Sequence, residues 1–163
     1  MNDRVGFIGL GVMGREMARN VSRSKEVVGF DPDQSRFDGL SGVERAASVE
    51  EIAQKAEFVL LSLPKTEVVS AVVEGDRGLL HNLREGQVVV DLSTTAPEET
   101  RRLASRLAEK GVGWVDAPVS GGQAGAESAT LSVMCGGTEK LYNAVRPILA
   151  CIGSSVVRVG ETG

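Results

Sequence analysis

The chain has 163 residues, of which 42% are hydrophobic and 25% are charged, and its formal net charge at pH 7 is -4. This length suits one domain, and the composition is that of a globular protein with enough apolar side chains for a core. Because the chain has no basic run, we do not expect it to bind nucleic acid. Its two cysteines are too few for a secreted disulfide scaffold, and none of its apolar runs is long enough to span a membrane.

Apolar runs alternate with amphipathic stretches from the first residues onward. Because the chain enters a strand-like run almost at once, we see no signal peptide and expect a soluble, cytoplasmic protein. The apolar runs predict strands over residues 5–9, 26–30, 43–46, 58–63, 87–91, 112–115, 130–135 and 155–159. Helical spacing of apolar residues predicts helices over 13–21, 48 onward, 66–73, 98–110 and 138–150.

Local residue chemistry supports several of these boundaries. Ser48 followed by Glu51 forms a capping box, Pro97 stands at a helix start, and Thr138 can cap the last helix. Residues 120–126, which are almost all small, predict a loop, and residues 81–82 predict a polar turn.

The alternation of strands and helices predicts an α/β fold. Strands and helices at this spacing form a doubly wound, mainly parallel sheet with helices on both faces. In such a sheet ligands bind beyond the carboxyl ends of the strands, where the strand order reverses. We expect residues 1–163 to form one such domain.

A glycine motif follows the first predicted strand and opens the first predicted helix. Gly9-Leu-Gly-Val-Met-Gly14 fits the G-x-G-x-x-G pattern of Rossmann-type dinucleotide-binding domains. Gly9 permits a tight turn, Gly11 lets the backbone approach a pyrophosphate, and Gly14 permits close packing of helix and strand. The free N–H groups of the helix start would hold the phosphates, and Leu10, Val12 and Met13 complete the expected cofactor-binding residues of this loop.

Asp31 ends the second predicted strand. In Rossmann-type domains an acidic residue at this place accepts hydrogen bonds from the ribose hydroxyls of the adenosine, and its charge repels a 2′-phosphate. NAD is therefore the expected cofactor and NADP the less favoured one. Two alternatives stay open: Arg36 swings toward a 2′-phosphate, or Asp31 only caps the Asp-Pro turn.

Four stretches resemble the β-hydroxyacid dehydrogenases, a family that includes 3-hydroxyisobutyrate dehydrogenase, tartronate semialdehyde reductase and, more distantly, 6-phosphogluconate dehydrogenase. The resemblance covers essentially the whole chain in order and spacing. The stretches are Phe7-Ile-Gly-Leu-Gly-Val-Met-Gly14, Leu63-Pro64, Asp91-Leu-Ser-Thr-Thr-Ala-Pro97 and Asp116-Ala-Pro-Val-Ser-Gly-Gly122.

The resemblance implies roles for individual residues. Leu63 and Pro64 would line the cofactor site, and Thr94 would bind the nicotinamide end of the cofactor. Ser93, beside Thr94, would contact the substrate. Ser120, Gly121 and Gly122 would hold the carboxylate of a small substrate through a hydroxyl and exposed N–H groups.

The resemblance also implies parts that these residues do not supply. Family members use a Lys on a long helix after the last strand as general acid/base, and a C-terminal helical domain closes the site and forms an oligomer. We expect this Lys and this domain to lie beyond residue 163, and the full-length protein to form homo-oligomers. The sequence also shows no metal-ligand cluster, and His81 lies in the predicted polar turn.

The expected function is that of an NAD-binding domain of an oxidoreductase. The whole enzyme would transfer a hydride between NAD and a short 3-hydroxy acid or its semialdehyde, and residues 1–163 alone would be inactive. The alternatives are a dinucleotide-binding module without catalysis and a domain of a related imine or phosphogluconate reductase. The phosphogluconate enzymes favour Asn-Arg-Thr after the second strand, where this chain has Asp-Pro-Asp.

Overall fold

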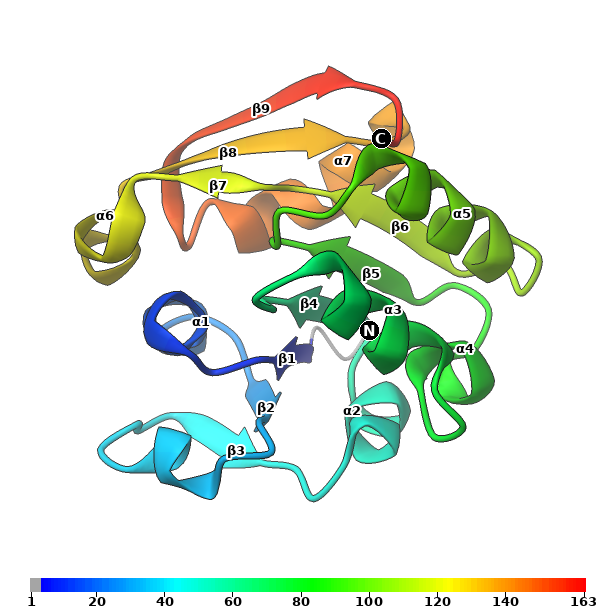
Figure 1. The fold of residues 1–163 in the computed structure, drawn as a ribbon. Helices are drawn as coiled ribbons and strands as arrows, with labels where there is room; N and C mark the ends of the chain where they lie inside the picture. The colour runs from blue at the N-terminus through cyan, green and yellow to red at the C-terminus, as the bar shows by residue number, and fades with distance from the viewer. Residues whose placement is uncertain (1–3) are drawn as a thin grey trace.

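The computed structural model describes residues 4–163. Within them a nine-stranded sheet has the order β3-β2-β1-β4-β5-β6-β8-β7, and β9 pairs with β8 outside this path (Figure 1). The strands are β1 Val5–Ile8, β2 Val27–Phe30, β3 Val43–Arg45, β4 Phe58–Leu61, β5 Val88–Asp91, β6 Gly113–Asp116, β7 Val119–Ser120, β8 Leu131–Gly136 and β9 Gly153–Gly160.

Helices connect most of these strands. They are α1 Val12–Ser22, the 3-10 helix η1 Gln34–Phe37, α2 Val49–Lys55, α3 Thr66–Glu74, α4 Leu79–Asn82, α5 Pro97–Ala108, α6 Gly122–Ser128 and α7 Glu139–Leu149. Figure 1 shows α1 and α6 on one side of the sheet and α2, α3, α4 and α5 on the other. The predicted doubly wound α/β fold with helices on both faces is therefore confirmed.

The pairing of the strands fixes where a ligand can bind. The strands from β3 to β6 are all parallel, and β1 lies between β2 and β4, so the strand order reverses beside β1. At the other end of the sheet β8 runs antiparallel to β6 and β7, and β9 runs parallel to β8. The reversal beside β1 places the glycine loop at the crevice where doubly wound sheets bind ligands.

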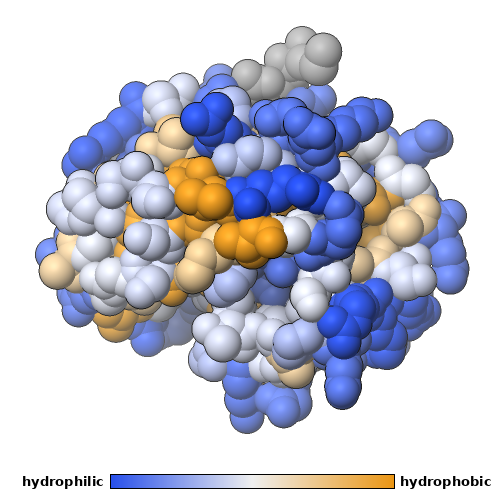
Figure 2. Space-filling view, turned by 90° about the horizontal axis from the view of Figure 1, so that it is seen from above, coloured by the Kyte–Doolittle hydropathy of each residue, from blue (hydrophilic) through white to orange (hydrophobic). Residues whose placement is uncertain are grey.

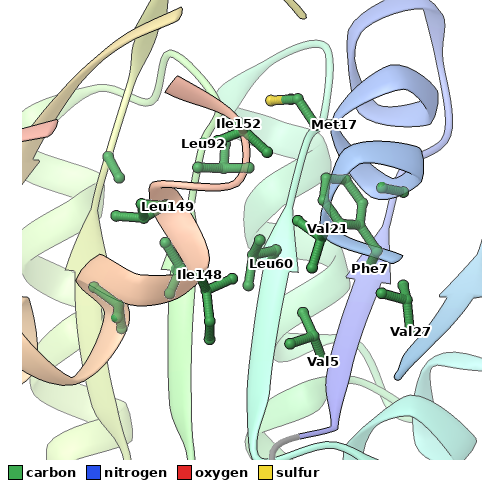
Figure 3. Close-up of a cluster of buried hydrophobic side chains, with 14 of the residues drawn as sticks. Val5, Phe7, Met17, Val21, Val27, Leu60, Leu92, Ile148, Leu149 and Ile152 are labelled. Carbon is green, nitrogen blue, oxygen red and sulfur yellow. The ribbon is translucent and has the colours of Figure 1, made fainter. Parts of the chain in front are cut away.

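Alternating side chains of the strands build a core on each face of the sheet. On the face toward α1 and α7, Phe7 and Leu60 are fully buried among residues that include Met17 and Leu149 (Figure 3). On the opposite face the apolar sides of the other helices cover the sheet. That second layer includes Ile8, Ile52, Val59, Leu61, Val69, Val73, Val89, Leu103, Leu107 and Trp114.

Three predicted helix starts are confirmed, two by side-chain caps and one by the position of a proline. The N–H of Glu51 donates to Ser48 Oγ at 3.2 Å, and the N–H of Leu141 donates to Thr138 Oγ1 at 3.3 Å. Pro97 occupies the first turn of α5, where its missing N–H costs no hydrogen bond. The Glu51 carboxylate differs from an ideal capping box because it accepts from the N–H of Ala47, one residue before the cap, at 2.7 Å.

Two local predictions are wrong. Residues 120–126, predicted as a loop, form the end of β7 and most of α6, and residues 81–82 belong to α4. Glycine weakens a helix by about 1 kcal/mol relative to Ala, so composition argued against α6. A tertiary contact outweighs this low helix propensity, because Asn20 Nδ2 on α1 donates to the carbonyl of Ala126 at 2.7 Å and both groups are buried. In α4 the apolar Leu79 and Leu80 are buried and fix the short helix.

The outer strands β8 and β9 carry exposed apolar side chains. Met134, Val157 and Val159 are 37%, 51% and 66% exposed. The view from above in Figure 2 shows apolar side chains gathered among polar ones on this side of the molecule. Among the described residues, no helix has both the length and the apolar character needed to cross a membrane.

An acidic side chain between α3 and α5 leads to a prediction about pH. Glu99 accepts hydrogen bonds from Arg102 Nη2 at 2.6 Å and from Ser70 Oγ at 2.5 Å, and together they lower the pKa of Glu99 from 4.5 to about 2. A carboxyl whose folded pKa is lowered contributes stability above its unfolded pKa, and that contribution is lost as the pH falls through the folded pKa.

We therefore expect Glu99→Gln to lower the free energy of unfolding by about 0.5–1 kcal/mol at neutral pH, the range for partly exposed ion pairs. The difference from the wild type should vanish as the pH falls from 4.5 toward 2. Urea unfolding at several pH values measures this difference. If it does not change with pH, the ionised Glu99 does not stabilise the packing of α3 on α5.

Candidate functional site

A cleft of about 580 Å³ opens at the carboxyl ends of β1, β2 and β4. Its walls are the glycine loop after β1, residues 31–33 and Arg36 after β2, and residues 62–64 after β4. Val68 and Val72 of α3 add apolar surface to the wall. The cleft therefore lies at the reversal of strand order, where sequence reasoning expected the cofactor.

A larger cavity of about 700 Å³ lies between α5 and α7, at the opposite ends of β5 and β6. Its walls are largely apolar, and Arg101 and Lys140 are among its lining residues. Doubly wound sheets bind their ligands at the carboxyl ends of the strands, so the smaller cleft is the better candidate site.

The three glycines of the loop differ in why the structure needs them. Gly9 has φ +94°, and a Cβ there would overlap the carbonyl oxygen of Ser62. A Cβ on Gly14 would overlap the carbonyl oxygen of Gly9. Gly11, in contrast, has φ -65°, and a Cβ there would have no atom within 4 Å. The fold itself therefore requires Gly9 and Gly14 but not Gly11, whose missing side chain leaves open space in the wall of the cleft.

The start of α1 is suited to an anion. Gly11 is the N-cap and has no side chain that could cap the helix, while the first turn carries no acidic residue. Val12 and Met13 line the cleft, and N–H groups in a first turn have no partner inside the helix. A pyrophosphate would fit this place, because it would accept from these N–H groups and fill the space beside Gly11.

Asp31 fixes the shape of the cleft. It is only 9% exposed, and its Oδ2 accepts from the N–H of Leu10 at 2.7 Å while its Oδ1 accepts from the N–H of Asp33 at 2.9 Å. The turn-capping role that the sequence left open is therefore present, together with a link to the glycine loop. Each carboxylate oxygen has a second lone pair, so Asp31 can still accept from a ribose hydroxyl.

Leu63 and Pro64, which the resemblance assigns to the cofactor site, lie in the wall of this cleft. The N–H of Leu63 donates to Ser93 Oγ at 2.9 Å, and the N–H of Ser93 donates to Asp91 Oδ1 at 3.0 Å. Ser93 is buried and ties the ends of β4 and β5 together, but its hydroxyl hydrogen can still be donated to another group.

Thr94 lines a separate small cavity of about 150 Å³ beyond β5 and β6. The same cavity contains Asp91 and Asp116, which are paired in register on neighbouring strands. Burial raises the pKa of Asp91, although Thr95 Oγ1 donates to its carboxylate at 2.5 Å. Sequence reasoning missed this pair of carboxylates. The available signal was an acidic residue at the end of each of two successive apolar runs.

Ser120, Gly121 and Gly122 are exposed where β7 leads into α6. Asn20, a second residue that sequence reasoning missed, positions α6 against α1 through its hydrogen bond to the Ala126 carbonyl. The signal for it was an Asn among the apolar positions of the helix predicted over 13–21. The glycine loop and the Ser120 segment thus belong to helices that contact each other directly.

Neither a Lys nor a His is among the residues that line the cleft within the described range 4–163. Lys55 pairs with Glu44, and Lys110 Nζ donates to the carbonyl of Leu80. His81 lies on α4, which leads into the amino end of β5. Lys65 follows Pro64 directly but lines a neighbouring groove. The described residues also contain no group of three or more His, Cys, Asp or Glu side chains that could hold a metal ion.

Comparison with known proteins agrees with this geometry. The family described as the NAD binding domain of 6-phosphogluconate dehydrogenase matches residues 4–160. The 2-(hydroxymethyl)glutarate dehydrogenase of Eubacterium barkeri is 37% identical over 163 residues, which cover 98% of this chain and 54% of that protein. The mitochondrial 3-hydroxyisobutyrate dehydrogenase of Drosophila melanogaster is 37% identical over 162 residues, covering 98% of this chain and 49% of that protein.

A solved structure extends the comparison to three dimensions. The 3-hydroxyisobutyrate dehydrogenase of Mycobacterium tuberculosis, whose structure includes L-serine, superposes with a TM-score of 0.92 at 32% identity. The match covers 99% of this chain and 56% of that one. The chain thus spans about half the length of the relatives that it matches.

Proposed function

Because the chain belongs to the family of NAD-binding domains described for 6-phosphogluconate dehydrogenase, we propose that it holds NAD in the 580 Å³ cleft beside the glycine loop. We further propose that it serves an oxidoreductase which transfers a hydride between NAD and a short 3-hydroxy acid or its semialdehyde. The observation that carries the proposal is the open space at Gly11, beside the uncapped start of α1.

The predicted residues take direct roles in this proposal except Leu10, which is fully buried, donates its N–H to Asp31 and supports the loop from inside. The N–H groups at the start of α1 bind the pyrophosphate, Asp31 accepts from the ribose hydroxyls, and the apolar wall at Leu63 and Pro64 covers the cofactor. Thr94 holds the nicotinamide end, where bound NAD supplies the hydride acceptor. Ser93 donates its free hydroxyl hydrogen to the substrate, and Ser120, Gly121 and Gly122 bind the substrate carboxylate.

Mapping the bound cofactor by NMR tests this proposal. Titrating NAD into the isotopically labelled chain should shift the amide signals of Gly11, Val12, Met13 and Asp31 most strongly. Signals beside the cavity between α5 and α7, such as that of Trp114, should stay in place. Shifts confined to that second cavity would mean that the cleft has been assigned wrongly.

Residues 1–163 alone are expected to bind NAD without turning over substrate. No Lys or His lines the cleft within the described range, and a positioned acid or base supplies about 10²–10⁴-fold in rate. An assay of 3-hydroxyisobutyrate, glycerate and their semialdehydes, followed by absorbance of NADH, measures this. Appreciable turnover would contradict the expectation, and substitution of Lys65, His81 and Lys140 would then identify the base. A chain extended to the length of the relatives is the matched control, and it should be active unless the protein is a non-catalytic binding module.

A further inference from the structure

Two carboxylates stand at the adenosine end of the cleft, and the structure uses them differently. Asp31 is buried, and both of its oxygens accept backbone N–H groups. Asp33, two residues further on, is exposed and lines the same cleft. The carboxylate of Asp31 therefore holds the backbone of the site together, while the carboxylate of Asp33 is exposed to a ligand that binds beside the turn.

Asp33 also holds the cation nearest to it along the chain. Its Oδ2 lies 3.3 Å from Arg36 Nε, and its Oδ1 accepts from the N–H and the hydroxyl of Ser35 at 3.1 and 2.7 Å. The hydrogen bonds from Ser35, together with the charge of Arg36, lower the pKa of Asp33, so this carboxylate is ionised at neutral pH.

The main chain at Arg36 is held by α1, while its side chain is partly exposed beside the cleft. Arg15 Nη1 on α1 donates to the carbonyl of Arg36 at 2.8 Å, which ties η1 to the helix that begins at the glycine loop. The guanidinium of Arg36 lines the cleft and is about half exposed, with 45% of its side chain accessible. A guanidinium at this place binds a phosphate group strongly when no carboxylate neutralises it.

We infer that Asp33 is a second residue, beside Asp31, that selects NAD over NADP, because it repels a 2′-phosphate and keeps the Arg36 guanidinium from binding one. This inference rests on the proposed function and refines it. Asp31 shapes the site and accepts from the ribose hydroxyls of NAD. The exposed Asp33–Arg36 pair then determines whether an added phosphate is accepted, and Asp33 acts on Arg36 as a positioning residue.

The test compares Asp33→Asn with a matched control, Asp38→Asn, by calorimetric titration of NAD and NADP. Both variants remove one negative charge from the same exposed segment, but Asp38 is not among the residues that line the cleft. The Asn at position 33 keeps an oxygen for Ser35. We expect Asp33→Asn to bind NADP about tenfold more tightly with NAD affinity nearly unchanged, and Asp38→Asn to keep the wild-type ratio.

Two further variants separate the parts of the inference. Asp33→Asn combined with Arg36→Ala should lose the gain in NADP affinity, and Asp31→Asn should lower the melting temperature and weaken the binding of NAD. An unchanged ratio of affinities in Asp33→Asn, with NAD still bound, overturns the inference and leaves the proposed function intact. A gain that survives Arg36→Ala overturns the role of Arg36. A wild-type chain that binds neither dinucleotide overturns the proposed function and, with it, this inference.

Discussion

Replacing Gly11 with Val is expected to abolish NAD binding and to leave the fold nearly unchanged. Gly11 has an extended backbone with φ -65°, which any residue adopts, and a Cβ there would have no atom of the protein within 4 Å. The added isopropyl group would therefore project into the space assigned to the pyrophosphate. We expect at least a ~100-fold loss of affinity, or about 2.7 kcal/mol. Exchange of an N-cap Gly for Val should cost the fold only about 1 kcal/mol.

Fluorescence of NADH on binding measures the first effect, and thermal unfolding followed by circular dichroism measures the second. Gly160→Val is a suitable control, because a Cβ there would also have no atom within 4 Å and Gly160 is not among the residues that line the cleft. Normal NADH binding by Gly11→Val would mean that the glycine loop is only a turn, and the phosphate site would have to be sought elsewhere.

Replacing Gly14 with Ala, which adds only a methyl group, is expected to affect the fold rather than the ligand site directly and to cause a large loss of stability. The new Cβ would overlap the carbonyl oxygen of Gly9 and approach Ser62 Cβ to 3.1 Å. Alanine normally stabilises a helix relative to Gly by about 1 kcal/mol, so the loss must come from the collision. Gly9 and Ser62 directly follow β1 and β4, and their N–H groups donate to the carbonyls of Phe30 and Ile8, so neither can move without disturbing the sheet. We expect a loss of about 3 kcal/mol in the free energy of unfolding.

Urea unfolding of Gly14→Ala beside Gly11→Val compares two glycines of one motif. If Gly14→Ala is as stable as the wild type, helix α1 can shift away from β1, and the close packing described here does not constrain the fold. If both variants unfold, the distinction between a glycine needed by the fold and one needed by the ligand is wrong.

The sequence predicts the strands and long helices well because each has a clear hydrophobic period. Phe58 to Leu61 is a continuous apolar run, and the structure buries Val59 to Leu61 between two layers of helices and leaves Phe58 partly buried. The glycine motif is equally clear, because a turn that joins a parallel strand to a helix at close range excludes side chains at Gly9 and Gly14. For such residues local sequence and tertiary structure impose the same requirement.

The sequence predicts the structure less well where contacts between distant residues determine the conformation. The seven residues of α6 contain two glycines and no strong apolar period, and the hydrogen bond from Asn20 that holds them comes from 106 residues away. From its position in the sequence, Asp31 alone is predicted to determine the preference for NAD over NADP. Only the structure shows that backbone N–H groups occupy both of its oxygens and that Asp33 is the exposed carboxylate. Such partners cannot be read from spacing, because they depend on how two loops approach each other.

The central claim is that this chain has a site for NAD beside the glycine loop, and calorimetric titration of NAD into residues 1–163 tests it most directly. The account predicts saturable binding at a single site per chain, with the heat of binding lost in Gly11→Val. Absence of binding by the wild-type chain, or equal binding by the wild type and Gly11→Val, would contradict it.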